Sequence, residues 1–220
     1  MKTISHIFSF VFHPLLVLFY SLFLLICLKP HLFGALHWQD QSLLLILIFI
    51  YTCVVPAIGF VLLKFTGFVK TFRMEDRMDR FGPLIICAIF YLWLWVNLKS
   101  QDQIPKLMIA FILASILSIF LAFALNTKIK VSLHTIAFGA FVTFWIILRL
   151  YHSEDGILQF RFLKSGVSAF HVNHLIGISL VLAGFIGTCR LYLKAHDASE
   201  LYLGYFVGIF STILAFSYTF

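Results

Sequence analysis

The sequence predicts an all-α protein, a bundle of six or seven membrane-spanning helices that forms one integral membrane domain over residues 1–220. Hydrophobic residues make up 62% of the chain and charged residues only 11%, whereas water-soluble domains carry about 25% charged residues. The mean hydropathy is +1.03. This composition excludes a soluble globular enzyme, and the length leaves little chain for a separate soluble domain.

Seven apolar stretches approach the roughly 20 residues that a helix needs to cross a membrane. The predicted spans are 7–28, 43–63, 83–98, 104–125, 131–150, 167–191 and 201–220. The stretch 83–98 is short, and a re-entrant segment there would leave six spans. Pro14 and Pro56 lie inside spans and predict kinks, which neighbouring helices can tolerate.

The polar connections predict a functional site at one end of this bundle. Residues 64–82, 126–130 and 192–200 hold most of the charged side chains between spans, and 64–82 holds the densest charge. With seven spans, all three connections lie on the same side as the amino terminus. The connections at 29–42, 99–103 and 151–166 carry only scattered charges.

The net charge of +7 suits lipid headgroups or an anionic substrate better than nucleic acid. We therefore expect membrane lipids as partners and no nucleic acid. A His-x-x-His step at His171 and His174 would place two metal ligands on one helical face, but that end of the bundle offers no further obvious ligands. The cysteines lack paired spacing and read as small core residues: Cys27, Cys53, Cys87 and Cys189.

The last thirty residues contain the most informative polar pattern. His196 lies six positions after Arg190, and Glu200, Gly204 and Gly208 then follow at steps of four positions. Residues four apart share one helical face, so an imidazole and a carboxylate meet where the last span begins. Ionisable groups at a membrane boundary are costly to desolvate and are candidates for function. The two glycines form a small-residue stripe that predicts close helix packing.

This pattern resembles the third motif of the type 2 phosphatidic acid phosphatase superfamily, the lipid phosphate phosphatases. That motif is Ser-Arg, five residues, His, three residues and Asp, and here it reads Cys189-Arg190, then His196, then Glu200. The second motif, Pro-Ser-Gly-His, is matched in part by residues 131–134, Val-Ser-Leu-His.

The first motif of the family, Lys, six residues and Arg-Pro, has two partial matches. One runs from Lys70 to Arg77 and the other from Arg73 to Arg80. In this chain two apolar segments separate the first motif from the second, whereas the family usually has six spans with both motifs in one connection. The resemblance covers roughly residues 70–210.

The resemblance implies hydrolysis of a lipid phosphate or a polyprenyl pyrophosphate through a phosphohistidine intermediate, without a metal or other cofactor. His196 would be the nucleophile, Glu200 would orient its ring, and His134 would be the general acid. Cationic and polar side chains would hold the phosphate oxygens: Arg190, Arg77, Arg80, Lys70, Arg73 and Ser132.

The departures from the family pattern keep a second function open. Leu133 replaces the glycine of the second motif, both prolines are missing, and Glu200 replaces an aspartate. The alternative is a catalytically inactive protein that binds or transports a lipid phosphate in the same cationic pocket. The enzyme would be a phosphoric monoester or acid anhydride hydrolase of lipid metabolism.

Each assignment also has a purely structural alternative. Arg190 could extend from a helix end toward lipid headgroups, and His196 with Glu200 could simply begin a helix. The charges of residues 73–80 could pair with one another, and His134 could bond a neighbouring helix.

The expected location is a bacterial inner membrane. Lys and Arg favour the amino-terminal face by ten to six, which the positive-inside rule would place in the cytoplasm. Many bacterial members of the family work on the outer side, so the side of the site stays open.

Overall fold

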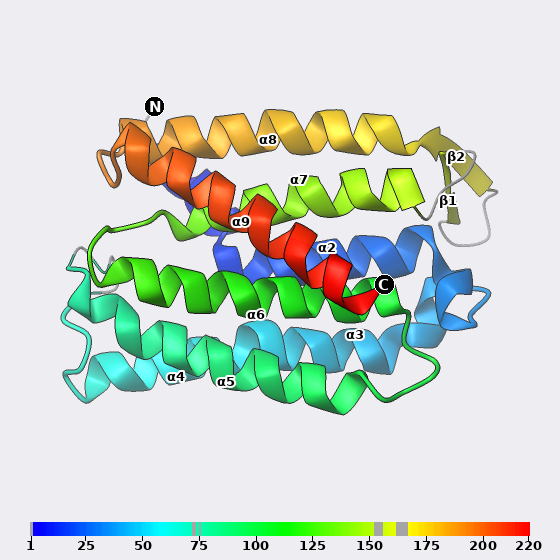
Figure 1. Ribbon diagram of the computed structural model, residues 1–220, viewed down its shortest axis with the longest axis horizontal. Coiled ribbons are helices and arrows are strands. Elements are labelled where there is room, and N and C mark those ends of the chain that lie inside the picture. The colour runs from blue at the N-terminus through cyan, green and yellow to red at the C-terminus, as the bar shows by residue number, and fades with distance from the viewer. Residues whose placement is uncertain (1, 72–73, 75, 152–155, 162–166) are drawn as a thin grey trace.

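The computed structural model in Figure 1 describes residues 2–71, 74, 76–151, 156–161 and 167–220. Its elements, in chain order, are α1 (Lys2–Val11), α2 (Pro14–Leu28), η1 (Pro30–Phe33), η2 (Trp38–Gln41), α3 (Ser42–Phe49), η3 (Ile50–Val54), α4 (Val55–Phe65), η4 (Met78–Arg80), α5 (Phe81–Leu98), α6 (Lys106–Asn126), α7 (Leu133–Tyr151), β1 (Ile157–Arg161), β2 (Val167–His171), α8 (Val172–Tyr192) and α9 (Ala198–Thr219).

The predicted membrane bundle is confirmed. Within the described residues six helices are long and apolar enough to cross a membrane, and α1 with α2 makes a seventh span if that bent pair is counted as one. Figure 1 shows the long helices side by side, with α9 running diagonally across α6 and α7. The buried core is dominated by large side chains such as Trp145, Phe111 and Phe144.

The first predicted span is broken at Pro14. Helices α1 and α2 meet at a bend of 55°, because proline has no N–H for the helical ladder and its ring crowds the preceding turn. His13 takes an extended conformation there, and its Nδ1 accepts the N–H of Leu15 at 3.4 Å. The hydroxyl of Tyr20 donates to the freed carbonyl of Val11 at 3.2 Å. The kink predicted at Pro14 is therefore a full break.

Pro56 produces a local irregularity in the second predicted span. The segment η3 just before it is a π-helix. Proline cannot donate to the carbonyl four residues earlier, which belongs to Thr52. The hydroxyl of Tyr91 in α5 donates to that carbonyl at 3.2 Å, so a neighbouring helix satisfies the backbone group that Pro56 leaves unpaired.

The prediction of a helix over 167–191 was wrong at its start. Val167–His171 is strand β2, which pairs antiparallel with β1 in a register that sets Ile157 opposite His171. The segment reads Val-Ser-Ala-Phe-His, and valine and phenylalanine are residue types that are enriched in strands. The helix α8 begins only at Val172, so β1 and β2 lie beyond the spans, at the end of the bundle opposite the amino terminus (Figure 1).

The glycine stripe of α9 packs closely against α7, as predicted. A Cβ at Gly204 would collide with the hydroxyl of Thr135, and one at Gly208 would collide with the backbone carbonyl of Ile136. This close approach brings the first turn of α9 next to the start of α7, where the N–H of Ser132 donates to the carbonyl of Glu200 at 3.4 Å. The second and third motif regions are thereby joined.

Candidate active site

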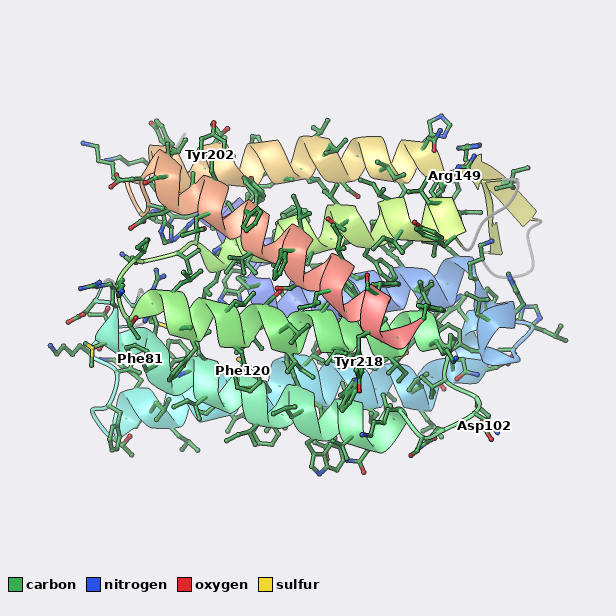
Figure 2. All side chains as sticks on the ribbon, in the orientation of Figure 1. Phe81, Asp102, Phe120, Arg149, Tyr202 and Tyr218 are labelled. Carbon is green, nitrogen blue, oxygen red and sulfur yellow. The ribbon has the colours of Figure 1, made fainter. Side chains whose placement is uncertain are left out.

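Three polar connections meet at the amino-terminal end of the bundle. Figure 1 shows the links α4–α5, α6–α7 and α8–α9 at the same end as the amino terminus. The sequence prediction that the polar connections share one face is confirmed. Figure 2 labels Tyr202 at this end and Asp102 and Arg149 at the other.

The turn between α8 and α9 points His196 back into the bundle. Lys194 has a positive φ of 51°, a left-handed conformation that usually falls to glycine after a helix end. The N–H of Ala195 donates to the carbonyl of Arg190 at 3.1 Å and closes the turn. A non-glycine residue in this region costs about 1–3 kcal/mol, so surrounding contacts must hold the turn in place.

His196 is buried, and both hydrogen bonds of its ring use the same nitrogen. Nδ1 lies 2.7 Å from Oε2 of Glu200 and 3.0 Å from the backbone carbonyl of Lys130. Both partners can only accept, because one is a carbonyl and the other a carboxylate. The proton therefore sits on Nδ1, and the neutral ring carries its lone pair on Nε2.

The pKa of His196 is lowered from 6.5 to about 3. Burial of the ring is the largest cause, and the positive charges of Arg80, Arg190 and Lys130 add to it. Removal from water disfavours the charged imidazolium, and nearby cations disfavour it further. The carboxylate of Glu200 orients the ring without protonating it. The side chain is thus a neutral, oriented imidazole across the physiological pH range.

We expect the His196 ring to stay neutral from pH 8 down to pH ~4.5 in the ligand-free protein. Nitrogen chemical shifts of labelled histidine, assigned with a His196→Gln variant, would measure this. In the unfolded chain the same ring takes up a proton near pH ~6.5. The unfolded state then binds more protons, so this group destabilises the fold as the pH falls from ~6.5 toward 3. Titration of the folded ring near pH ~6.5 would contradict the assignment.

Arg80 and Arg190 bring two guanidinium groups to the same place. Arg80 is 6% exposed, and it lies near enough to Arg190 and Glu200 for their charges to interact. Its NH1 donates to the carbonyl of Val131 at 2.8 Å. In the described part of the chain neither arginine forms an ion pair with a carboxylate within 4.0 Å, and Nε of Arg190 has no hydrogen-bond partner. Cations in such surroundings favour the binding of an anion.

These residues open onto one chamber of about 810 Å³. Its polar wall contains Arg80, Lys130, His134, Arg190 and His196. The remainder of the wall is mostly apolar and extends between the helices. The arrangement joins a cationic end, which carries the neutral imidazole of His196, to an apolar interior.

His134 and His13 also belong to the polar wall. Nε2 of His134 lies 3.0 Å from the carbonyl of Ser9, so this nitrogen donates and Nδ1 holds the lone pair in the neutral ring. The predicted alternative, that His134 bonds a neighbouring helix, therefore occurs in the structure. The ring of His13 lies edge-on to that of His134, with centroids 5.8 Å apart. Because Nδ1 of His13 accepts from Leu15, its neutral ring carries the proton on Nε2.

The carboxylate of Glu200 both contacts His196 and caps the first turn of α9. Besides its contact with His196, Oε2 accepts the N–H of Asp197 at 3.4 Å, which begins α9. The carboxylate thus fixes the helix start and the imidazole together. The sequence had offered these as alternatives.

The two candidates for the first motif are separated by the structure. Arg80 lines the chamber, whereas Arg77 is exposed and donates to the carbonyls of Thr127 and Lys128. Lys70 is exposed and pairs with Asp76 at 3.8 Å. Neither Arg77 nor Lys70 is among the described residues that line the chamber. Arg73 lies outside the described residues.

Ser132 is fully buried between the start of α7 and the first turn of α9. Its hydroxyl has no hydrogen-bond partner among the described residues, and Ser132 is not among the residues that line the chamber. Its backbone instead joins α7 to α9. The N–H of Ser132 donates to the backbone carbonyl of Glu200, and the carbonyl of Ser132 accepts the hydroxyl of Thr135.

Four histidines and lysines among the described residues of the chamber wall were not assigned from the sequence: His6, His13, Lys130 and Lys194. Lys130 contributes its carbonyl to His196 and its charge to the polar wall, and His13 and Lys194 also line the chamber. Lys130 stands two residues before Ser132, so its place in the second motif region was the available signal. His13 was visible only as a histidine beside a proline inside a span.

Comparison of the chain with protein-family models, with curated proteins and with solved structures found no match in any of the three. The function must therefore be inferred from the chemistry of the residues in this chamber.

Proposed function

We propose that this membrane protein is a metal-independent phosphatase that hydrolyses a lipid phosphate or a polyprenyl pyrophosphate through a phosphohistidine intermediate. The observation that carries the proposal is the hydrogen bonding of His196. Nδ1 is tied to two acceptors, which leaves Nε2 as a neutral nucleophile on a buried ring. A carboxylate beside the ring stabilises the positive charge that the ring acquires on attack.

The cations around His196 supply the electrostatic part of the reaction. Phosphoryl transfer depends mainly on positioning and on stabilising the charge of the transferring group. Arg80 and Arg190, with Lys130 nearby, line the chamber that also contains His196. Guanidinium groups match the geometry of phosphate oxygens, and they can take the part that a metal ion takes in other phosphatases.

The proposed reaction has two steps. In the first, Nε2 of His196 attacks phosphorus, an N–P bond forms, and the P–O bond to the lipid breaks. The leaving oxygen takes a proton from a histidine of the chamber wall, His134 or its neighbour His13. In the second, water attacks the phosphohistidine and gives up a proton to the same wall. The N–P bond breaks and phosphate leaves.

One observation favours a binder without turnover as the second candidate. The Nε2 proton of His134 is held by the carbonyl of Ser9 at 3.0 Å, so His134 must be protonated on Nδ1 or leave Ser9 before it can serve as an acid. A protein that kept the cationic pocket but lacked proton transfer would bind a lipid phosphate and leave it intact.

Phosphate release in the presence of a chelator separates the two candidates. We expect the purified protein in detergent to release inorganic phosphate from phosphatidic acid or a polyprenyl pyrophosphate with ethylenediaminetetraacetate present, because arginines supply the positive charge. Binding of these lipids without any release would instead support the binder. Activity that requires added divalent metal would contradict the proposed mechanism.

The proposal also places the protein in lipid metabolism at a bacterial inner membrane. An integral membrane location is consistent with the six candidate spans. The connections that carry the polar residues lie at the end of the bundle that holds the amino terminus (Figure 1), so headgroup chemistry would occur at one membrane surface while the apolar part of the chamber lies within the bilayer.

A further inference from the structure

The chamber extends much further into the bundle than a phosphate group requires. On α6 its lining residues run from Ala122 to Phe111, which is about 16 Å along a helix. On α5 they run from Pro83 to Tyr91, and on α7 from Leu133 to Ala140. All three helices thus face the chamber from the polar end to near the middle of the bundle or beyond.

The wall of this deep part is apolar. Leu18, Phe60, Phe111 and Ala140 are among the residues that line it. Two serines of α6 interrupt the wall. Ser115 donates to the carbonyl of Phe111 at 3.2 Å, and the buried hydroxyl of Ser118 has no hydrogen-bond partner among the described residues. The deep part therefore suits a hydrocarbon chain.

Phe111 marks the far end of the chamber. Its ring packs on that of Phe144, with centroids 4.3 Å apart, and the two residues are 2% and 0% exposed. A chain that reaches Phe111 therefore meets two closely packed, buried rings. The chamber thus has a polar end and an aromatic end.

We propose that the chamber takes one hydrocarbon chain of the substrate into the protein and measures its length against Phe111. The substrate class is a lipid phosphate with an unbranched or isoprenoid chain of limited length inside the bundle, while any second chain stays in the bilayer. The proposal builds on the proposed function, since it concerns the tail of the same ligand. A depth of about 16 Å corresponds to roughly a dozen chain carbons in an extended conformation.

The volume agrees with a single chain. A chamber of about 810 Å³ lies within the range of about 300–1,000 Å³ that small-molecule sites occupy. Each additional methylene of the ligand that is buried in the chamber raises the affinity of the protein for that ligand by about fourfold. Chains that reach Phe111 must stop or fold back, so affinity should cease to rise at that length.

The test compares binding of decyl and hexadecyl phosphonate, which resist hydrolysis, by thermal stabilisation of the purified protein in detergent. Partition of each probe into micelles is the same for every variant, so the ratio of the two affinities isolates the chamber. We expect Phe111→Ala to raise the hexadecyl-to-decyl affinity ratio by about fourfold or more. Phe111→Leu provides a milder change if the alanine variant does not fold.

Phe120→Ala is the matched control. Phe120 lies on the same helix, labelled in Figure 2, but it is 49% exposed and outside the chamber lining. Its removal should leave the ratio unchanged. An equal ratio in wild type, Phe111→Ala and Phe111→Leu would overturn the proposal.

The outcomes also separate this inference from the proposed function. If phosphonates bind with the expected dependence on Phe111 but no lipid phosphate is hydrolysed, the proposed phosphatase activity is wrong and the proposed chain-binding role of the chamber is supported. If hydrolysis depends on His196 and the affinity ratio is the same in every variant, the tail site fails and the phosphatase stands.

Discussion

His196→Ala is expected to lower phosphate release from a lipid phosphate by at least about 1,000-fold, because the variant loses the nucleophile. No other described residue combines a buried imidazole with a carboxylate partner at 2.7 Å. The measurement is the initial rate of phosphate release by purified wild type and variant in the same detergent. Binding of an alkyl phosphonate should persist in the variant, because Arg80 and Arg190 are unchanged.

Glu200→Gln is the informative companion to this variant. The amide keeps the size of the side chain and an acceptor oxygen, but it removes the negative charge that stabilises the ring during attack. We expect an intermediate loss of rate with little change in phosphonate binding. A His196→Ala protein that still turned over at the wild-type rate would rule out His196 as the nucleophile.

Arg190→Ala is expected to lower kcat/KM by about 100- to 1,000-fold, the usual cost of one positioned catalytic donor, and to weaken phosphonate binding as well. Nε of Arg190 has no hydrogen-bond partner among the described residues, so its removal breaks no structural bond that would confuse the result. The measurement is the rate of phosphate release over a range of lipid concentrations, with binding followed in parallel.

Arg77→Ala tests the other register of the first motif. Arg77 is exposed and is held by the carbonyls of Thr127 and Lys128, so its loss should change kcat/KM by no more than about threefold. A large loss on Arg77→Ala, with little effect of Arg190→Ala, would show that the phosphate lies outside the chamber.

The spans were predictable because the membrane imposes a length and an apolar composition on each helix. Two features of the fold could not be predicted from the sequence. Pro14 predicts a kink, but the size of the bend depends on how His13 and Tyr20 satisfy the backbone at the break. The strand Val167–His171 is apolar enough to resemble the start of a span, and only its pairing with β1 distinguishes it.

The centre of the site was predictable because its residues follow one another at helical spacing. His196 and Glu200 do meet, although His196 lies in the turn before α9, which begins only at Ala198. The choice between Arg77 and Arg80 was not predictable, since adjacent registers of a loop look alike in sequence. Lys130 contributes a backbone carbonyl to His196. Because every residue has a backbone carbonyl, the sequence cannot indicate which one accepts this hydrogen bond.

The chamber itself lay beyond the reach of the sequence. Phe, Leu and Ile occur throughout the spans, so the pattern cannot tell a chamber wall from a lipid-facing surface. Phe111 and Phe120 lie on the same helix, yet one is 2% exposed and the other 49%. Tertiary packing alone decides which of them lines the chamber.

Trapping the phosphoenzyme tests the proposed mechanism most directly. Wild-type protein is mixed briefly with lipid labelled in its phosphate, denatured in alkali, digested and analysed by mass spectrometry. We predict an acid-labile, alkali-stable phosphoryl group on His196 that is absent from His196→Ala. Phosphate release at full rate with no phosphoryl group on His196, or with the group on another residue, would contradict the mechanism.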